Sequence, residues 1–172
     1  MTDKPNYRIN RSVVKMTEHI AQSAVGNSLL RAQKVYGVET SIMFAERGPG
    51  YHTSPHMHDC EQMNIIVSGE MFFFVDGRGY RCKPGDVMRI PRNAVHWAWN
   101  RGSKTAVLVE SHSPPLTGTV FDHGEAVALL GPNEDDASIQ HKGNILVKMD
   151  QAEINAIEAR AIAEEEDHVA AE

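Results

Sequence analysis

The stretch GYHTSPHMHDCEQMNIIVSG, residues 50–69, decides the fold of this chain. It places His56 and His58 one residue apart, and Pro55 just before them disfavours a helix. Residues two apart on a strand point to the same face, whereas on a helix they would diverge by about 200°. We therefore expect both imidazoles to lie on one face of a strand, where they can bind one metal ion.

A two-histidine site needs further ligands, and the sequence offers candidates for two more positions. His96 begins another strand-like run, HWAWN, and a third neutral imidazole would leave coordination positions open for a substrate. Glu61 and Gln62 compete for the fourth position, since neighbours on a strand point to opposite faces. Charge favours Glu61, whereas the parity that Gln62 shares with Asn64 favours Gln62.

The composition excludes several classes of protein. The chain has 172 residues, 41% hydrophobic and 23% charged, with a formal net charge of −6. These values are typical of a globular domain, and no dense basic patch indicates nucleic-acid binding. No apolar run approaches the roughly 18 residues of a membrane span, and the polar N-terminus has no signal-peptide pattern. We expect a cytoplasmic protein with reduced cysteines.

The pattern along the chain changes twice. Residues 39–118 alternate short apolar runs with Gly, Pro and Asp turn signals, as is typical of an all-β sandwich or barrel. Residues 1–38 form an N-terminal extension with weak helical or extended segments. Residues 119–172 form a C-terminal extension with a helix at about 150–166, where Asp150 can cap the first turn and Ile154, Ile157 and Ala161 share one face.

Two segments of the central zone resemble the two conserved motifs of the cupin superfamily. Residues 50–69 read G-x5-H-x-H-x3-Q-x6-G, and residues 85–100 read G-x5-P-x-N-x2-H-x3-N. The spacing agrees at every anchor, and two identities differ: Gln62 replaces the usual Glu, and Asn93 replaces the usual Gly. Asn tolerates a positive φ better than most residues. Within cupins, the chain is most similar to small cupins of pectin degradation and to manganese-dependent hydroxynitrile lyases.

The resemblance implies a double-stranded β-helix, the cupin jelly-roll barrel, with an N-terminal extension and a C-terminal helix. It implies one divalent ion per chain, bound by His56, His58, Gln62 and His96. Nitrogen and oxygen ligands suit Mn, Fe, Ni, Co or Zn. A neutral Gln62 would leave a more electrophilic ion than Glu would, which favours Lewis-acid chemistry.

Three functions are compatible with such a site. The first is a metal-dependent lyase or isomerase acting on a small carbonyl, hydroxy or sugar-acid metabolite. The alternatives are a mononuclear Fe(II) dioxygenase and a non-catalytic binder of small molecules. In each case the partner is a small molecule, and neither nucleic acid nor membrane is expected.

Other residues around the site are predicted from strand parity. Asn64 and Phe73 should line the barrel interior and contact substrate. His52 could act as a general base at the barrel mouth, with a solvated surface histidine as the alternative. Two pairs of aromatic residues should face outward, either into a homodimer interface or under the terminal segments: Phe72 with Phe74, and Trp97 with Trp99.

Overall fold

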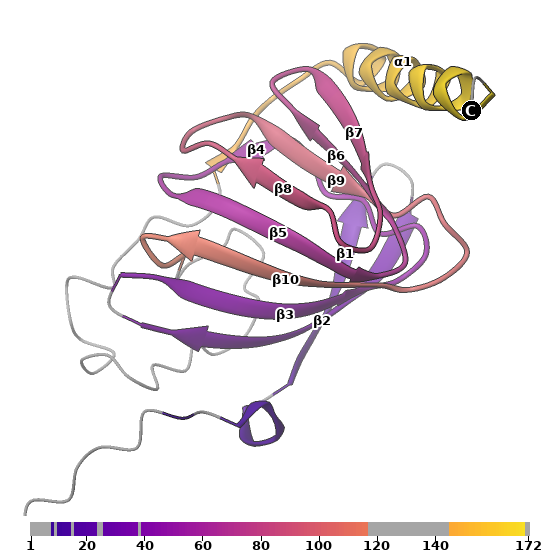
Figure 1. Ribbon diagram of the computed structural model, residues 1–172. Helices are drawn as coiled ribbons and strands as arrows, with labels where there is room; N and C mark the ends of the chain where they lie inside the picture. The colour runs from indigo at the N-terminus through magenta and orange to yellow at the C-terminus, as the bar shows by residue number, and fades with distance from the viewer. Residues whose placement is uncertain are drawn as a thin grey trace, which may run out of the picture.

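The computed structural model describes residues 8, 10–14, 16–23, 26–37, 39–116 and 145–170, and its strands form two antiparallel sheets (Figure 1). The six-stranded sheet has the order β1-β2-β3-β10-β5-β8, and the five-stranded sheet has the order β11-β4-β9-β6-β7. The elements are η1 (Arg11–Val13), β1 (Thr17–Ser23), β2 (Gly26–Tyr36), β3 (Ser41–Arg47), β4 (His56–Met57), β5 (Glu61–Ser68), β6 (Met71–Val75), β7 (Arg78–Cys82), β8 (Val87–Ile90), β9 (His96–Trp99), β10 (Ala106–Ser113), β11 (Ile145–Leu146) and α1 (Gln151–Ala170). The expected all-β barrel with a C-terminal helix is confirmed.

Alternation along the strands builds the barrel interior. In β3 and β10 every second side chain is buried. The inward side chains of the two sheets meet in one core, which includes Met43 and Ile66 from the six-stranded sheet and Phe73 and Ala98 from the other. Strands with one buried and one outer face produce this pattern.

The N-terminal segment contributes strands to the barrel sheet. β1 pairs with β2, and β2 pairs with β3 in a register that places Tyr36 opposite Ser41. The division drawn at residues 38 and 39 thus falls in the connection between β2 and β3. At the other end, residues 119–144 of the expected C-terminal extension lie outside the described residues.

Helix α1 covers the outer face of the five-stranded sheet (Figure 1). The backbone N–H of Ala152 donates to Asp150 Oδ1 at 3.0 Å, so Asp150 caps the helix as expected. The helix continues to Ala170, beyond the predicted end, and the predicted face formed by Ile154, Ile157 and Ala161 is buried. Among the described helices, none is long and apolar enough to cross a membrane.

The outward aromatic residues lie beneath this helix. Phe72, Phe74 and Trp97 form a second core cluster with the buried face of α1, and Trp99 packs against it. Two alternatives were expected for these side chains, a homodimer interface or burial under a terminal segment. The structure shows burial under the C-terminal helix of the same chain. The aromatic faces are therefore not available as a homodimer surface.

Two motif positions adopt backbone conformations that explain their residue types. Asn93 has φ +60°, the left-handed region that Asn tolerates where the resembling motif has Gly. Gly69 has φ +71°, and a Cβ there would lie 2.8 Å from Ala106 Cα. A side chain at residue 69 would therefore collide with the backbone of β10.

The contact between α1 and β7 predicts a sensitive position. A Cβ built on Gly79 would lie 2.2 Å from Ala161 Cβ. Gly79→Ala should therefore lower the free energy of unfolding by about 1–3 kcal/mol, because the helix must shift outward. Urea denaturation followed by tryptophan fluorescence measures this change.

Gly48→Ala is the matched control, because the nearest atom to its added Cβ lies at an ordinary 3.5 Å. Equal stability of Gly79→Ala and Gly48→Ala would show that the helix does not pack on β7 as described.

Candidate metal centre

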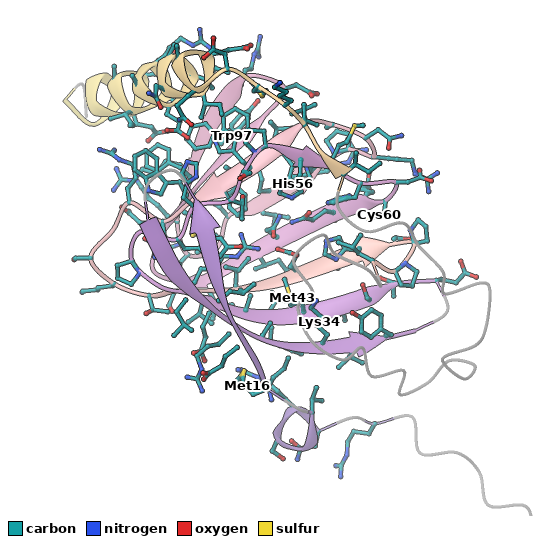
Figure 2. All side chains as sticks on the ribbon, turned by 180° about the vertical axis from the view of Figure 1, so that it is seen from behind. Met16, Lys34, Met43, His56, Cys60 and Trp97 are labelled. Atoms are coloured by element: carbon teal, nitrogen blue, oxygen red, sulfur yellow. The ribbon has the colours of Figure 1, made fainter. Side chains whose placement is uncertain are left out.

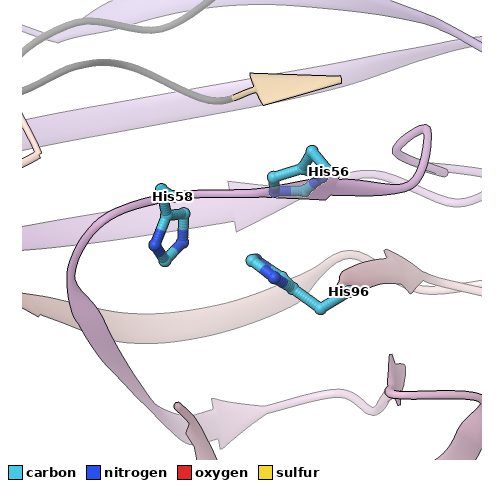
Figure 3. A group of neighbouring side chains, drawn as sticks. All are labelled: His56, His58 and His96. Atoms are coloured by element: carbon cyan, nitrogen blue, oxygen red, sulfur yellow. The ribbon is translucent and has the colours of Figure 1, made fainter. Parts of the chain in front are cut away.

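Three histidines converge inside the barrel: His56 on β4, His58 just after that strand, and His96 on the neighbouring β9 (Figure 3). The antiparallel pairing of β4 with β9 places His56 directly opposite His96. His58 follows two residues after His56, and the three rings face one another with one ligand nitrogen of each within 4.8 Å of the others. Each side chain is less than 9% exposed. His56 and His58 thus lie together as expected, although His58 is one residue beyond the end of β4, and strand pairing adds His96.

Backbone carbonyls orient the three imidazoles. Nδ1 of His56 lies 2.8 Å from the Ser54 carbonyl, and Nδ1 of His96 lies 2.9 Å from the Ala94 carbonyl. Nδ1 of His58 lies 3.1 Å from the Cys60 carbonyl. A carbonyl only accepts, so each Nδ1 carries the proton and each Nε2 retains its lone pair. This is the tautomer that a metal-binding histidine requires.

Burial keeps His56 and His96 neutral. It lowers the pKa of His56 to about 4, with the neighbouring His58 adding to the shift. Burial likewise holds the pKa of His96 well below its usual value, and His56 lowers it further. Neutral imidazole is the form that binds a metal ion, so no proton needs to leave these two residues at neutral pH.

Gln62, and not Glu61, faces the three histidines. Gln62 is buried on β5, and its Oε1 lies 2.8 Å from His58 Nε2. In the assigned orientation of the two amides, its Nε2 donates to Asn64 Oδ1 at 3.1 Å. Glu61 points outward and pairs with Arg89 at 2.5 Å. The charge of Arg89 is therefore balanced by Glu61 within the same chain.

The donor set fits a divalent cation. Both Gln62 Oε1 and His58 Nε2 are acceptors in the assigned forms, yet they lie 2.8 Å apart. His96 Nε2 is buried and has no hydrogen-bond partner among the described residues. A shared cation would satisfy these lone pairs, which would otherwise be costly to bury. The four residues named from the sequence are those that would hold it.

A second polar cluster lies beside the histidines and was not singled out from the sequence. Glu110 and His112 occupy alternate inward positions of β10, where His112 is the cross-strand neighbour of Gln62. Arg47 Nη2 donates to Glu110 Oε2 at 2.5 Å, and Glu110 Oε1 lies 3.4 Å from His112 Nε2. The parity that these two β10 residues share with the buried Leu108 is the signal that could have found them.

Neighbouring charges keep Glu110 ionised, whereas His112 is neutral. Burial is the largest influence and would by itself raise the pKa of Glu110, but Arg47 together with His112, His58 and Lys34 outweighs it, so the net effect lowers that pKa. Burial lowers the pKa of His112 to about 4 despite the opposing effect of Glu110. The cluster is therefore an ion pair beside a neutral imidazole. The ring of His112 also packs edge-on against His58, with ring centroids 5.4 Å apart.

His52 has a different neighbourhood from the one expected. It is only 4% exposed, so it is not a solvated surface histidine. It bridges to Trp99, which shares the outward face of β9, and its Nε2 lies 2.7 Å from Glu158 Oε1 on helix α1. Trp97 Nε1 donates to the same oxygen at 2.9 Å. Its Nε2 is thus engaged by the helix, while His52 also lines the cavity that contains the three histidines.

The remaining candidates lie near the centre in different roles. Phe73 lines the cavity that contains the three histidines. Asn64 is buried and accepts a hydrogen bond from the amide of Gln62, so it would hold this candidate metal ligand in place. The Cys60 thiol is buried, which raises its pKa to about 12, and its Sγ lies 3.1 Å from Nδ1 of His58, the nitrogen turned away from the shared site.

Comparisons with known proteins agree with this architecture. A family model described as a cupin domain matches residues 43–112. Two auxin-binding proteins of Nicotiana tabacum, T85 and T92, are each 24% identical over 118 residues, which is 61% of this chain. The match covers 63% of each relative, so the chain spans less than two thirds of their length.

Solved structures share the fold. An RmlC-like cupin from Shewanella frigidimarina superposes with a TM-score of 0.52 at 19% identity, covering 64% of this chain and 92% of that one. The polyketide cyclase RemF from Streptomyces resistomycificus superposes with a TM-score of 0.57 at 16% identity, covering 86% of this chain and 89% of that one. At these identities the likeness concerns the fold alone.

The metal ligands can be tested by substitution. His96→Ala and Gln62→Ala should each weaken metal binding by about tenfold or more, because each removes a ligand atom from the shared site. Mass spectrometry of the purified protein after dialysis against a chelator series measures the retained metal.

Glu61→Ala provides the control, since Glu61 lies outside the barrel. Loss of metal from Glu61→Ala but not from Gln62→Ala would reverse the assignment of the fourth ligand.

Proposed function

We propose that this chain, whose barrel belongs to the cupin superfamily, is a metal-dependent lyase or isomerase acting on a small oxygenated metabolite. The observation that carries this proposal is a neutral metal-ligand set beside an ionised carboxylate in one cavity. The three histidines, Gln62 and Glu110 all line that cavity. Lyases and isomerases of this type need an electrophile and a proton carrier together.

The side chains divide the work. A divalent ion bound by His56, His58, Gln62 and His96 would act as a Lewis acid on a carbonyl or alkoxide oxygen. Glu110, held in its ionised form by Arg47, would accept a proton from the substrate at Oε1. His112 Nε2 lies 3.4 Å from this oxygen and would be the neighbour of the carboxylic acid that forms.

A cupin barrel with three histidines is also compatible with O₂ chemistry on Fe(II), so the first test separates the two reactions. The metal-loaded protein would be incubated in D₂O, without oxygen, with a panel of hydroxy and oxo acids. We expect exchange or turnover without oxygen, with Mn and Zn both active. NMR measures the exchange, and an oxygen electrode measures O₂ uptake. Activity that requires O₂ and Fe(II) would indicate a dioxygenase, and binding without turnover would indicate a binder.

The role of Glu110 gives a second prediction. Glu110→Gln should lower the rate of proton exchange by about 10²–10⁴-fold, the usual contribution of a general base. Glu70→Gln is the matched control, because Glu70 pairs with Arg81 outside the cavity. Equal rates for Glu110→Gln and Glu70→Gln would remove Glu110 from the mechanism.

We also propose a homodimer formed by the outer face of the six-stranded sheet. Exposed apolar side chains gather there on β5 and β8: Met63, Ile65, Val67 and Val87, each 41–60% exposed. The charged Arg89 and Glu61 beside them already neutralise each other, so a second copy would meet no net charge from this pair. A face of this kind is typical of contacts between identical subunits.

Ile65→Lys should shift the protein to monomers in sedimentation velocity at micromolar concentration. Tyr80→Lys, on the other sheet, should leave the oligomeric state unchanged. A wild-type protein that sediments as a monomer would contradict the proposed dimer.

A further inference from the structure

Arg47 is a buried cation with unused hydrogen-bonding capacity at the cavity. Its side chain lines the cavity and is 5% exposed. One nitrogen, Nη2, donates to Glu110, and the guanidinium lies over the Tyr51 ring at 5.0 Å from its centroid. Its Nε–H is buried and has no hydrogen-bond partner within the described part of the chain. Guanidinium donors match carboxylate oxygens, so this N–H is a place for an acceptor from a ligand.

The charge around the cavity favours an anion. Among its lining residues, Arg47 carries a positive charge and Glu110 carries the negative charge that balances it. The proposed metal ion would add further positive charge without an acidic ligand to offset it. A cavity with this balance attracts a small anion more than a neutral or cationic molecule.

The remaining wall has a polar part, formed by Tyr36, Ser41, Tyr51, Thr53 and Ser54, and an apolar part. Leu30, Met43, Phe73, Ile90 and Leu116 line the cavity, and all five are buried. Figure 2 labels Lys34 and Met43 on the six-stranded sheet and His56 across the interior from them. A sugar acid needs a polar partner for each hydroxyl, because a buried hydroxyl without one is costly. The apolar part of the wall offers no such partner and suits an alkyl or aromatic body.

We infer that the cavity binds a small carboxylate with an apolar body, and that Arg47 is a specificity-determining residue that donates Nε–H to the carboxylate. This narrows the proposed function from any small oxygenated metabolite to this class and away from sugar acids. It rests on the proposed function because ligand and metal share one cavity.

Equilibrium dialysis of the metal-loaded full chain tests the ligand class. Phenylacetate is the probe, and the comparison compounds are acetate, phenylacetamide and galacturonate. Acetate lacks the apolar body, phenylacetamide lacks the charge, and galacturonate replaces the body with hydroxyls. We expect phenylacetate to bind at least about tenfold more tightly than each, since each comparison removes one group that the cavity recognises. Equal, weaker or undetectable binding of phenylacetate overturns the inference.

Arg47→Lys tests the residue. Lysine retains the charge beside Glu110 but lacks the Nε–H and the planar fork. We expect phenylacetate to bind about tenfold more weakly, while phenylacetamide binding and metal content stay within about twofold of wild type. Arg101→Lys is the matched control, because Arg101 lies over the Phe72 and Trp99 rings. Unchanged phenylacetate binding by Arg47→Lys would remove Arg47 from recognition.

Metal analysis of the same samples separates this inference from the proposed function. A protein that contains no metal but prefers phenylacetate through Arg47 would retain the ligand class and lose the metal-dependent reaction. A metal-containing protein that prefers galacturonate would retain the metal-dependent reaction and lose the inferred ligand class.

Discussion

The backbone pairing of β4 with β9 is the constraint on which the rest of the site depends. It sets His56 opposite His96 in the barrel interior, with ring centroids 4.2 Å apart. Two basic groups that are buried this close to each other are stable together only when both are neutral. Their burial and their Nδ1 hydrogen bonds to backbone carbonyls produce that state and leave the opposite nitrogens available. The geometry that prevents protonation is the geometry that would bind a cation.

Strand β9 also connects the candidate metal centre to the C-terminal helix. Along β9, His96 points into the barrel, whereas Trp97 points outward and donates to Glu158 of α1. His52 shares that carboxylate, so the helix is joined to the sheet by a buried polar contact as well as by apolar packing. One four-residue strand therefore supplies a candidate metal ligand on one face and an anchor for the helix on the other.

The facing sheet brings a second kind of chemistry to the cavity. Its register places His112 beside Gln62 and Glu110 beside Asn64. A neutral ligand amide and an ionised carboxylate thus lie on adjacent strands, and Arg47 keeps the carboxylate charged. Because the carboxylate of Glu110 is not one of the candidate ligands, a bound cation would keep its full charge while Glu110 stays nearby as a base. It is the physical basis of the proposed lyase or isomerase chemistry.

Local spacing determined much of this protein from the sequence alone. The spacing of His56 and His58 predicted that the two imidazoles would lie together, and strand parity favoured Gln62 over Glu61. The tolerance of Asn93 for a positive φ followed from its residue type. The all-β fold and the C-terminal helix followed from the same short-range patterns. Only the tertiary structure decided the rest. Arg47 and Glu110 are 63 positions apart in the sequence, and their meeting depends on how distant strands pair. Which segment covers an outward aromatic face likewise depends on long-range packing, which no local pattern encodes.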